Sequence, residues 1–157
     1  MVRHGRRDEN TMDHQVRALV FFDIGGTLAT VTLGPGGASI AALDVFPEVP
    51  EVLGRLRDRG VRLGIISDPG PIPTSEVDRA LRDAGIATSF DPDLVIYGAK
   101  RSPAIFRLAS TRSRPGGTLL FVGENDEERS HAVHAGFLVR SSPSLALDLL
   151  NGRHADS

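Results

Sequence analysis

Four short polar segments of the chain carry the side chains that could do chemistry, and each of them follows an apolar run. They supply a carboxylate with a hydroxyl, a second hydroxyl, an ammonium group and a pair of carboxylates, which are Asp23 with Thr27, Ser67, Lys100, and Glu124 with Glu128. Lys100 is the one lysine of the sequence. A nucleophilic carboxylate beside a cation and further oxygen ligands suits a phosphate group held next to a divalent metal ion.

The apolar runs before these segments predict strands buried on both faces, because they are short, continuous and bounded by glycine or polar residues. Five runs have this form, at 18–22, 61–66, 93–97, 118–122 and 137–140. Amphipathic stretches between and after them predict helices at 49–59, at 74–84, from 102 onward, at 126–135 and at 144–150. The alternation predicts an α/β fold with three layers, a Rossmann-like, doubly wound parallel sheet of about five strands covered by helices on both faces.

The four polar segments are expected to meet, because ligands of open parallel sheets bind at the carboxyl ends of the strands. One stretch, 30–40, interrupts the alternation directly after the loop of the first strand. Two β-favouring runs there flank a glycine-rich turn at 34–37, which predicts a small β-hairpin flap.

Length and composition fit one ordinary domain, expected at 17–157, behind a polar, aperiodic segment at 1–16 that is typical of a disordered tail. A net charge of −2 gives no overall field that would attract nucleic acid or an acidic membrane. No apolar run reaches the roughly 18 residues of a membrane span, and the sequence has no cysteine for disulfides or thiolate metal sites. We expect a cytoplasmic protein without a nucleic-acid or membrane partner; a homo-oligomer is left open.

The order and context of the polar segments resemble the haloacid dehalogenase-like superfamily, which consists mostly of phosphatases. The four stretches that carry the resemblance are FFDIGGTL at 21–28, IIS at 65–67, GAKRSPAIF at 98–106, and VGENDEE at 122–128 followed by Ala-Gly at 135–136. Each motif alone is weak, but four in the family's order make the resemblance specific. The chain is identified as a small, capless member with a degenerate first motif.

The resemblance implies a role for each residue. Asp23 would be the nucleophile, forming an aspartyl-phosphate that water then hydrolyses. Lys100 would assist it and, with Ser67 and Thr27, would hold the phosphoryl oxygens. Mg²⁺ would be held by four oxygen donors, namely Asp23, the backbone carbonyl of Gly25, Glu124 and Glu128. The substrate would be a phosphorylated small molecule or macromolecule.

The sequence departs from the family pattern at three places. Gly25 stands where the family's phosphatases have the aspartate that serves as general acid and base, so we expect activity weakened by about 10²- to 10⁴-fold. Glu124 and Glu128 stand where the family usually has aspartate, so a bound metal ion or the backbone would have to shift. The gaps between the motifs are too short for a cap domain, which leaves the hairpin as the candidate lid.

Other interpretations of these residues remain open. Glu124 and Glu128 could simply favour the start of a helix, where acidic side chains interact well with the helix dipole. Asp68 could replace the missing acid or base, although an aspartate before Pro-Gly is more typical of a turn. The main function hypothesis is a Mg²⁺-dependent phosphohydrolase or phosphotransferase. Its alternatives are a catalytically inactive binding or regulatory module, and a nucleophilic Asp23 that attacks a centre other than a phosphomonoester.

Overall fold

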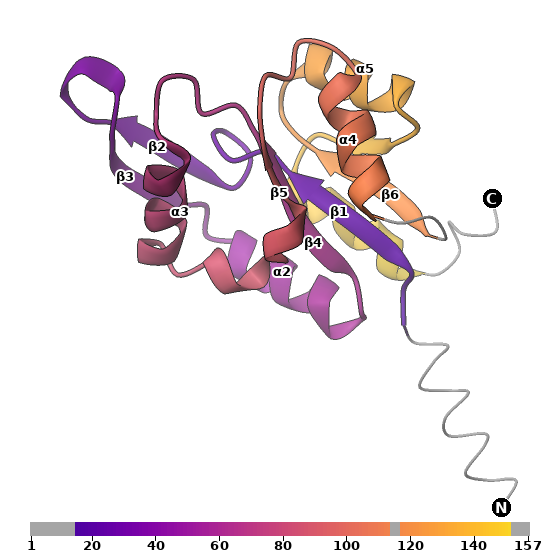
Figure 1. Ribbon diagram of the computed structural model, residues 1–157. Helices are drawn as coiled ribbons and strands as arrows, with labels where there is room; N and C mark the ends of the chain where they lie inside the picture. The colour runs from indigo at the N-terminus through magenta and orange to yellow at the C-terminus, as the bar shows by residue number, and fades with distance from the viewer. Residues whose placement is uncertain (1–14, 114–116, 152–157) are drawn as a thin grey trace, which may run out of the picture.

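The computed structural model describes residues 15–113 and 117–151, and most of the tail expected at 1–16 lies outside them. Its centre is a five-stranded sheet, all of whose neighbouring strands pair in parallel, in the order β5-β4-β1-β6-β7 (Figure 1). The strands are β1 (Ala18–Phe22), β4 (Arg62–Ser67), β5 (Val95–Tyr97), β6 (Thr118–Val122) and β7 (Leu138–Arg140). The predicted α/β class and the five-stranded parallel sheet are confirmed.

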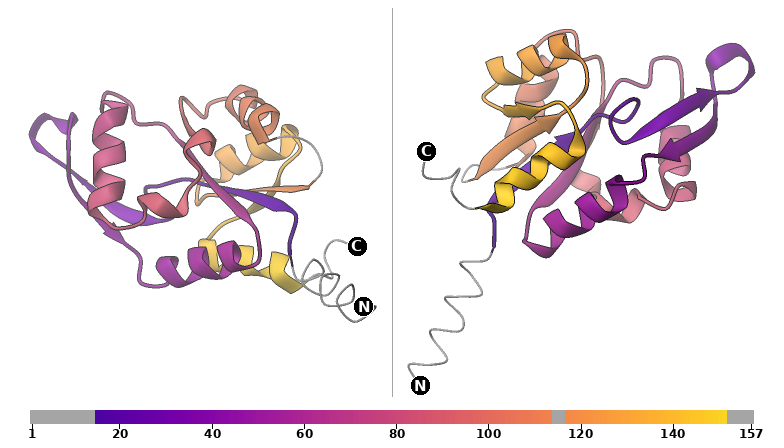
Figure 2. Two further views of the ribbon diagram at one scale, coloured as in Figure 1. Left: turned by 60° about the horizontal axis from the view of Figure 1, so that its bottom comes forward. Right: turned by 180° about the vertical axis from the view of Figure 1, so that it is seen from behind.

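Helices cover both faces of the sheet, as the alternation of strands and helices predicts. The helices α2 (Val49–Asp58) and α3 (Thr74–Asp83) lie on one face with the 3₁₀ helix η4 (Pro143–Asn151), and α4 (Ala104–Ser113) and α5 (Asp126–His134) lie on the other (Figure 2). The helix predicted at 144–150 is the 3₁₀ helix η4, which packs beside α2.

The central strand β1 shows why the sheet needs both layers. Its side chains alternate between the faces, so that Val20 and Phe22 join the core under α2 and α3 while Leu19 and Phe21 join the core under α4 and α5. All five of its residues are buried, as expected for a continuous apolar run. The carboxyl end of β1 is thereby held from both sides.

The structure extends the predicted hairpin and shortens one predicted strand. The strands β2 (Ala29–Leu33) and β3 (Ile40–Val45) pair in antiparallel fashion, so the second strand begins where the prediction ends. The run expected at 93–97 is half turn and half strand, because Pro92–Leu94 forms a 3₁₀ turn in which Asp91 accepts a hydrogen bond from the Asp93 amide. Local capping overrides β-propensity there.

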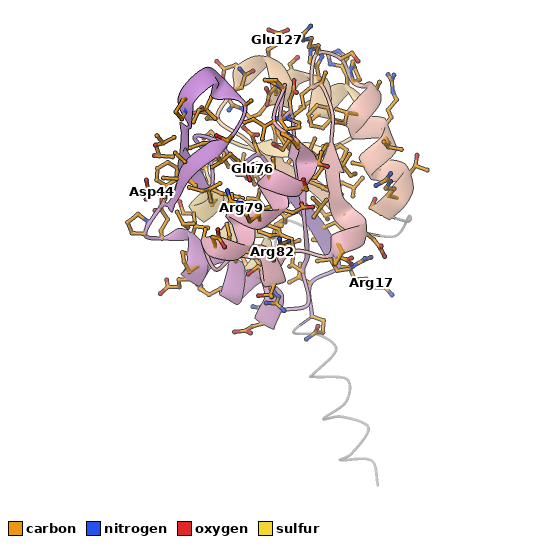
Figure 3. All side chains as sticks on the ribbon, turned by 60° about the vertical axis from the view of Figure 1, so that its left-hand side comes forward. Arg17, Asp44, Glu76, Arg79, Arg82 and Glu127 are labelled. Atoms are coloured by element: carbon orange, nitrogen blue, oxygen red, sulfur yellow. The ribbon has the colours of Figure 1, made fainter. Side chains whose placement is uncertain are left out.

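The hairpin extends away from the sheet and lies beside α3 (Figures 1 and 3). The Ile40 amide donates to Glu76 Oε2 at 3.1 Å, and Arg79 donates to the Ile40 carbonyl at 3.4 Å. The helix is attached to the sheet in turn, because the Tyr97 hydroxyl donates to Asp78 Oδ1 at 2.5 Å. Burial, followed by this bond to Asp78, raises the pKa of Tyr97 well above its usual range.

Within the described residues, no helix combines the length and the apolar character that a membrane crossing needs.

Candidate active site

The carboxyl edge of the sheet gathers five of the seven predicted site residues around one cavity of about 440 Å³. These residues are Asp23 and Gly25 after β1, Ser67 at the end of β4, Lys100 before α4, and Glu128 in the first turn of α5. They come from four segments that are far apart in the sequence. Parallel strands explain the meeting, since their carboxyl ends all point to the same edge.

Lys100 lies at the centre of this group with its side chain 3% exposed. Its Nζ donates a hydrogen bond to Asp23 Oδ1 at 2.6 Å and lies 3.0 Å from Glu128 Oε1. It also donates to the Ile66 carbonyl at 3.3 Å. A buried ammonium group requires such partners, because an unpaired charge away from water costs several kcal/mol.

Asp23 is fixed by the strand that it follows. Its amide donates to the Val122 carbonyl at 3.0 Å, which continues the pairing of β1 with β6 by one residue. Ser67 is fixed in the same way, because its carbonyl accepts a hydrogen bond from the Gly98 amide at 2.9 Å. The nucleophile candidate and the hydroxyl candidate therefore stand at the edge of the sheet, on backbone that is hydrogen-bonded to its neighbours.

The other two predicted residues, Thr27 and Glu124, join loops beside the cavity and do not line it. The Thr27 side chain is buried, and its hydroxyl oxygen accepts a hydrogen bond from the Glu124 amide at 3.3 Å. The Glu124 carboxylate lies over Gly26, where a Cβ atom would stand 2.1 Å from Glu124 Oε1. Gly26 also has a φ of +77°, so glycine is required there for both reasons.

Gly25, in contrast, could carry a side chain. Its φ is not in the left-handed region, and a Cβ atom placed on it would meet only Val31 Cγ2, at an ordinary contact distance of 3.7 Å. The missing carboxylate at this position is therefore a property of the sequence, since the backbone leaves room for it.

The oxygen atoms at the cavity suit a hard cation such as Mg²⁺. Asp23 and Glu128 offer carboxylates and Gly25 a backbone carbonyl at the same cavity. Glu128 Oε1 is buried and pairs with Lys100 Nζ at 3.0 Å, so a metal ion would share this oxygen with the lysine. Across 15–113 and 117–151, however, no three acidic or histidine side chains are grouped as a ready metal site.

Two further groups of residues line the cavity, and of these only Asp68 was considered from the sequence. Asp68 lines the cavity, and its Oδ1 accepts a hydrogen bond from the Gly70 amide at 3.0 Å, which is the turn geometry that a sequence of this kind favours. The second group is apolar and comes mainly from the hairpin, with Val31 and Leu33 as examples. The alternation of apolar and polar residues along β2 was the signal that could have indicated this wall.

Comparison with known proteins supports a fold assignment. No family model and no curated protein matches the chain. Among solved structures, a hydrolase from Streptococcus pneumoniae TIGR4 has a TM-score of 0.66 at 14% identity, covering 86% of this chain and 98% of that one. A Had-superfamily hydrolase from Ehrlichia chaffeensis has a TM-score of 0.64 at 12% identity, covering 88% and 98%.

A third solved structure is a D,D-heptose 1.7-bisphosphate phosphatase from B. bronchiseptica, complexed with magnesium and phosphate. It has a TM-score of 0.57 at 15% identity and covers 78% of each chain. Identities this low show the fold alone. The motifs and the architecture thus agree: the chain has the three-layer α/β fold of the haloacid dehalogenase-like hydrolases and phosphatases.

Proposed function

We propose that the chain is a phosphohydrolase or phosphotransferase of the haloacid dehalogenase-like type in which Asp23 is the nucleophile. The observation that carries the proposal is the buried Lys100 ammonium group, which contacts both Asp23 and Glu128 at the sheet edge. A carboxylate held against a buried cation, in a cavity next to the hydroxyl of Ser67, is equipped to meet a phosphoryl group.

In the proposed reaction an Asp23 carboxylate oxygen attacks phosphorus. A bond from that oxygen to phosphorus forms, and the bond from phosphorus to the ester oxygen breaks, with its electron pair going to the leaving group. Water then attacks the aspartyl-phosphate, which releases inorganic phosphate and regenerates the carboxylate. If an acceptor hydroxyl replaces water, the same intermediate gives phosphoryl transfer.

Charge supports a requirement for a divalent cation. With the lysine positive and both carboxylates negative, Lys100, Asp23 and Glu128 together carry one net negative charge. A phosphate dianion would be repelled by such a group unless a further cation joined it. Mg²⁺ would be held by Asp23, the Gly25 carbonyl and Glu128, and when bound it would neutralise charge on the phosphoryl oxygens. Glu124, whose carboxylate lies over Gly26 beside the cavity, would join these ligands only after a change of its side-chain conformation.

Gly25 limits which esters react quickly. It has no group that could protonate a departing alkoxide or activate the attacking water, so solvent has to do both. We expect aryl esters with weakly basic leaving groups to react faster than alkyl esters, and the phosphoenzyme to persist. This is the weakened activity expected from Gly25, which replaces the acid and base aspartate of the family's first motif.

The test is phosphate release from p-nitrophenyl phosphate with Mg²⁺, for wild type and for Asp23→Asn. We expect a loss of at least about a thousandfold in the variant, because the nucleophile is absent. Asp44→Asn, which removes an exposed carboxylate on β3, is the matched control and should keep the wild-type rate. Equal rates for wild type and Asp23→Asn would overturn the proposal.

A second candidate function is a binding or regulatory module that keeps the fold and a phosphate pocket without turnover. Gly25, and the absence of three grouped metal ligands among the described residues, favour it. It predicts that inorganic phosphate binds while no ester is hydrolysed. Metal-dependent turnover that disappears in Asp23→Asn would exclude it.

A further inference from the structure

The cavity that holds Asp23 has two ends of different chemistry. Its polar side chains all come from the sheet edge. The opposite wall is built by the hairpin, by the part of the loop after β4 that follows Asp68, and by α3, and its side chains are apolar. They include Val31, Leu33, Ile40, Leu43, Ile72 and Val77.

The hairpin turns an apolar face toward the cavity because side chains alternate along a strand. On β2, Val31 and Leu33 line the cavity, while Thr30 and Thr32, which alternate with them along the strand, are exposed to solvent. Leu33 lines the cavity and is nevertheless 50% exposed. A large apolar side chain left open in a cavity wall indicates a place for apolar ligand surface.

This wall has no side chain that could recognise a polar substituent. Among the cavity-lining residues within the described ranges, those with hydrogen-bonding side chains are Asp23, Ser67, Asp68, Lys100 and Glu128. All of them belong to the sheet edge, where the phosphate would bind. A sugar hydroxyl or a second phosphate group pressed against the hairpin would lose its water without gaining a side-chain partner, and a polar group left unpaired costs about 1–3 kcal/mol.

We infer that the substrate is a small phosphomonoester whose organic part is apolar, an alkyl or aryl group that packs against the hairpin while the phosphate meets Asp23 and Lys100. This inference rests on the proposed function. It is supported by continuity, since the polar end and the apolar wall enclose one cavity of about 440 Å³, a size typical of small-molecule sites.

Binding of alkylphosphonates tests this substrate class without any need for turnover. Affinities of methyl-, propyl- and hexylphosphonate for the wild-type protein would be measured by titration calorimetry in Mg²⁺. Each fully buried methylene contributes about fourfold in affinity. For a partly open cavity we expect at least about a tenfold rise from methyl- to hexylphosphonate. Propylphosphonate should bind at least about threefold more tightly than 2,3-dihydroxypropylphosphonate, because the wall offers no partner for the hydroxyls.

Two leucine variants provide the matched comparison. Leu33→Asn should reduce the ratio of hexyl to methyl affinity by at least about threefold. Leu138 on β7 is 49% exposed, much like Leu33, but it does not line the cavity. Leu138→Asn should therefore leave this ratio at the wild-type value. A ratio near one for wild type, or equal effects of the two variants, would overturn the inference.

The result separates this inference from the proposed function. If p-nitrophenyl phosphate is hydrolysed through Asp23 but phosphonate affinity does not depend on chain length, the substrate class is wrong and the proposed function stands. If no phosphonate binds and no ester is hydrolysed, both are wrong.

Discussion

The two walls of the cavity differ in how they are held in place. The polar wall consists of loops that leave buried strands, and its central charge, Lys100, contacts two carboxylates and a backbone carbonyl. The apolar wall is largely a two-stranded hairpin, a structure that is marginally stable alone. It is held to α3 by polar bonds from Glu76 and Arg79 to the backbone of Ile40, and by packing of Ile40 into the core that contains Val77. In the proposed function, the reacting groups stand at the sheet edge and the contacts with the organic part of the substrate come mainly from the hairpin.

This difference suggests that changes at the polar wall should act on catalysis and global stability, while changes at the hairpin should act on substrate selection. Groups that take part in a reaction need a fixed geometry, whereas groups that contact the organic part of a ligand can vary in position. Three variants test this division.

The largest effect is expected from restoring the missing carboxylate at the polar wall. Gly25→Asp should raise the hydrolysis of phenyl phosphate by about 10²- to 10⁴-fold, because a positioned acid then protonates the leaving oxygen. A Cβ atom fits at this position with an ordinary contact to Val31. Phosphate release and circular dichroism would be measured together. The double variant Gly25→Asp with Asp23→Asn is the control, and it should remain inactive.

An unchanged rate for a folded Gly25→Asp protein would place the limitation elsewhere, with the two glutamates as the next candidates.

Removal of the central cation should destabilise the whole domain. Lys100→Met leaves Asp23 and Glu128 close together with no positive charge between them, which should lower the free energy of unfolding by about 3 kcal/mol in urea titrations. Adding Glu128→Gln to this variant should recover part of the loss, since one carboxylate is then neutral. Arg107→Met, an exposed cation on α4, is the control and should change stability little. A Lys100→Met protein as stable as wild type would contradict the central role of this charge.

The smallest effect is expected at the hairpin, and it depends on pH. The hydrogen bond from Arg79, followed by that from the Ile40 amide, lowers the pKa of Glu76 below its usual value of 4.5. The attachment of the hairpin is therefore fully present above about pH 4.5, and it is lost as the pH falls through the lowered pKa of the folded state. Hydrogen exchange of the Ile40 amide, corrected for the intrinsic rate, should show protection that falls over this acidic range.

Glu76→Gln should lower this protection at neutral pH and remove its acidic pH dependence, because the titrating group is gone. Global stability in urea should change little. An Ile40 amide whose protection is the same in Glu76→Gln at every pH would show that the hairpin is held by its apolar contacts alone.

Much of the fold could be predicted because the five strands are continuous apolar runs and each is followed by a glycine or polar stop. β1 and β6 begin and end where the pattern predicts. The hairpin was underestimated because the alternation in Ile40–Val45 is weak, with three of its first four residues being alanine or leucine. Pairing with β2 and the bonds to α3 extend this strand, and neither can be read from the local sequence.

The candidate site could be predicted in its composition and less well in its contacts. Asp23, Ser67, Lys100 and Glu128 were expected at one edge because each follows a strand. Spacing could not tell which acid would contact Lys100, and Glu128 lies beside it while Glu124 lies over Gly26. The apolar wall was missed because it is a tertiary feature, formed where a hairpin, a proline-rich loop and α3 come together.

The claim that Asp23 becomes phosphorylated can be tested directly. Wild-type protein would be incubated with Mg²⁺ and acetyl phosphate, whose leaving group needs no proton, then quenched in acid, digested and examined by peptide mass spectrometry. We predict a phosphoryl group on the peptide that contains Asp23, absent in Asp23→Asn and shorter-lived in Gly25→Asp. Hydrolysis of p-nitrophenyl phosphate with no phosphoryl group on Asp23, or with one on another residue, would contradict the account.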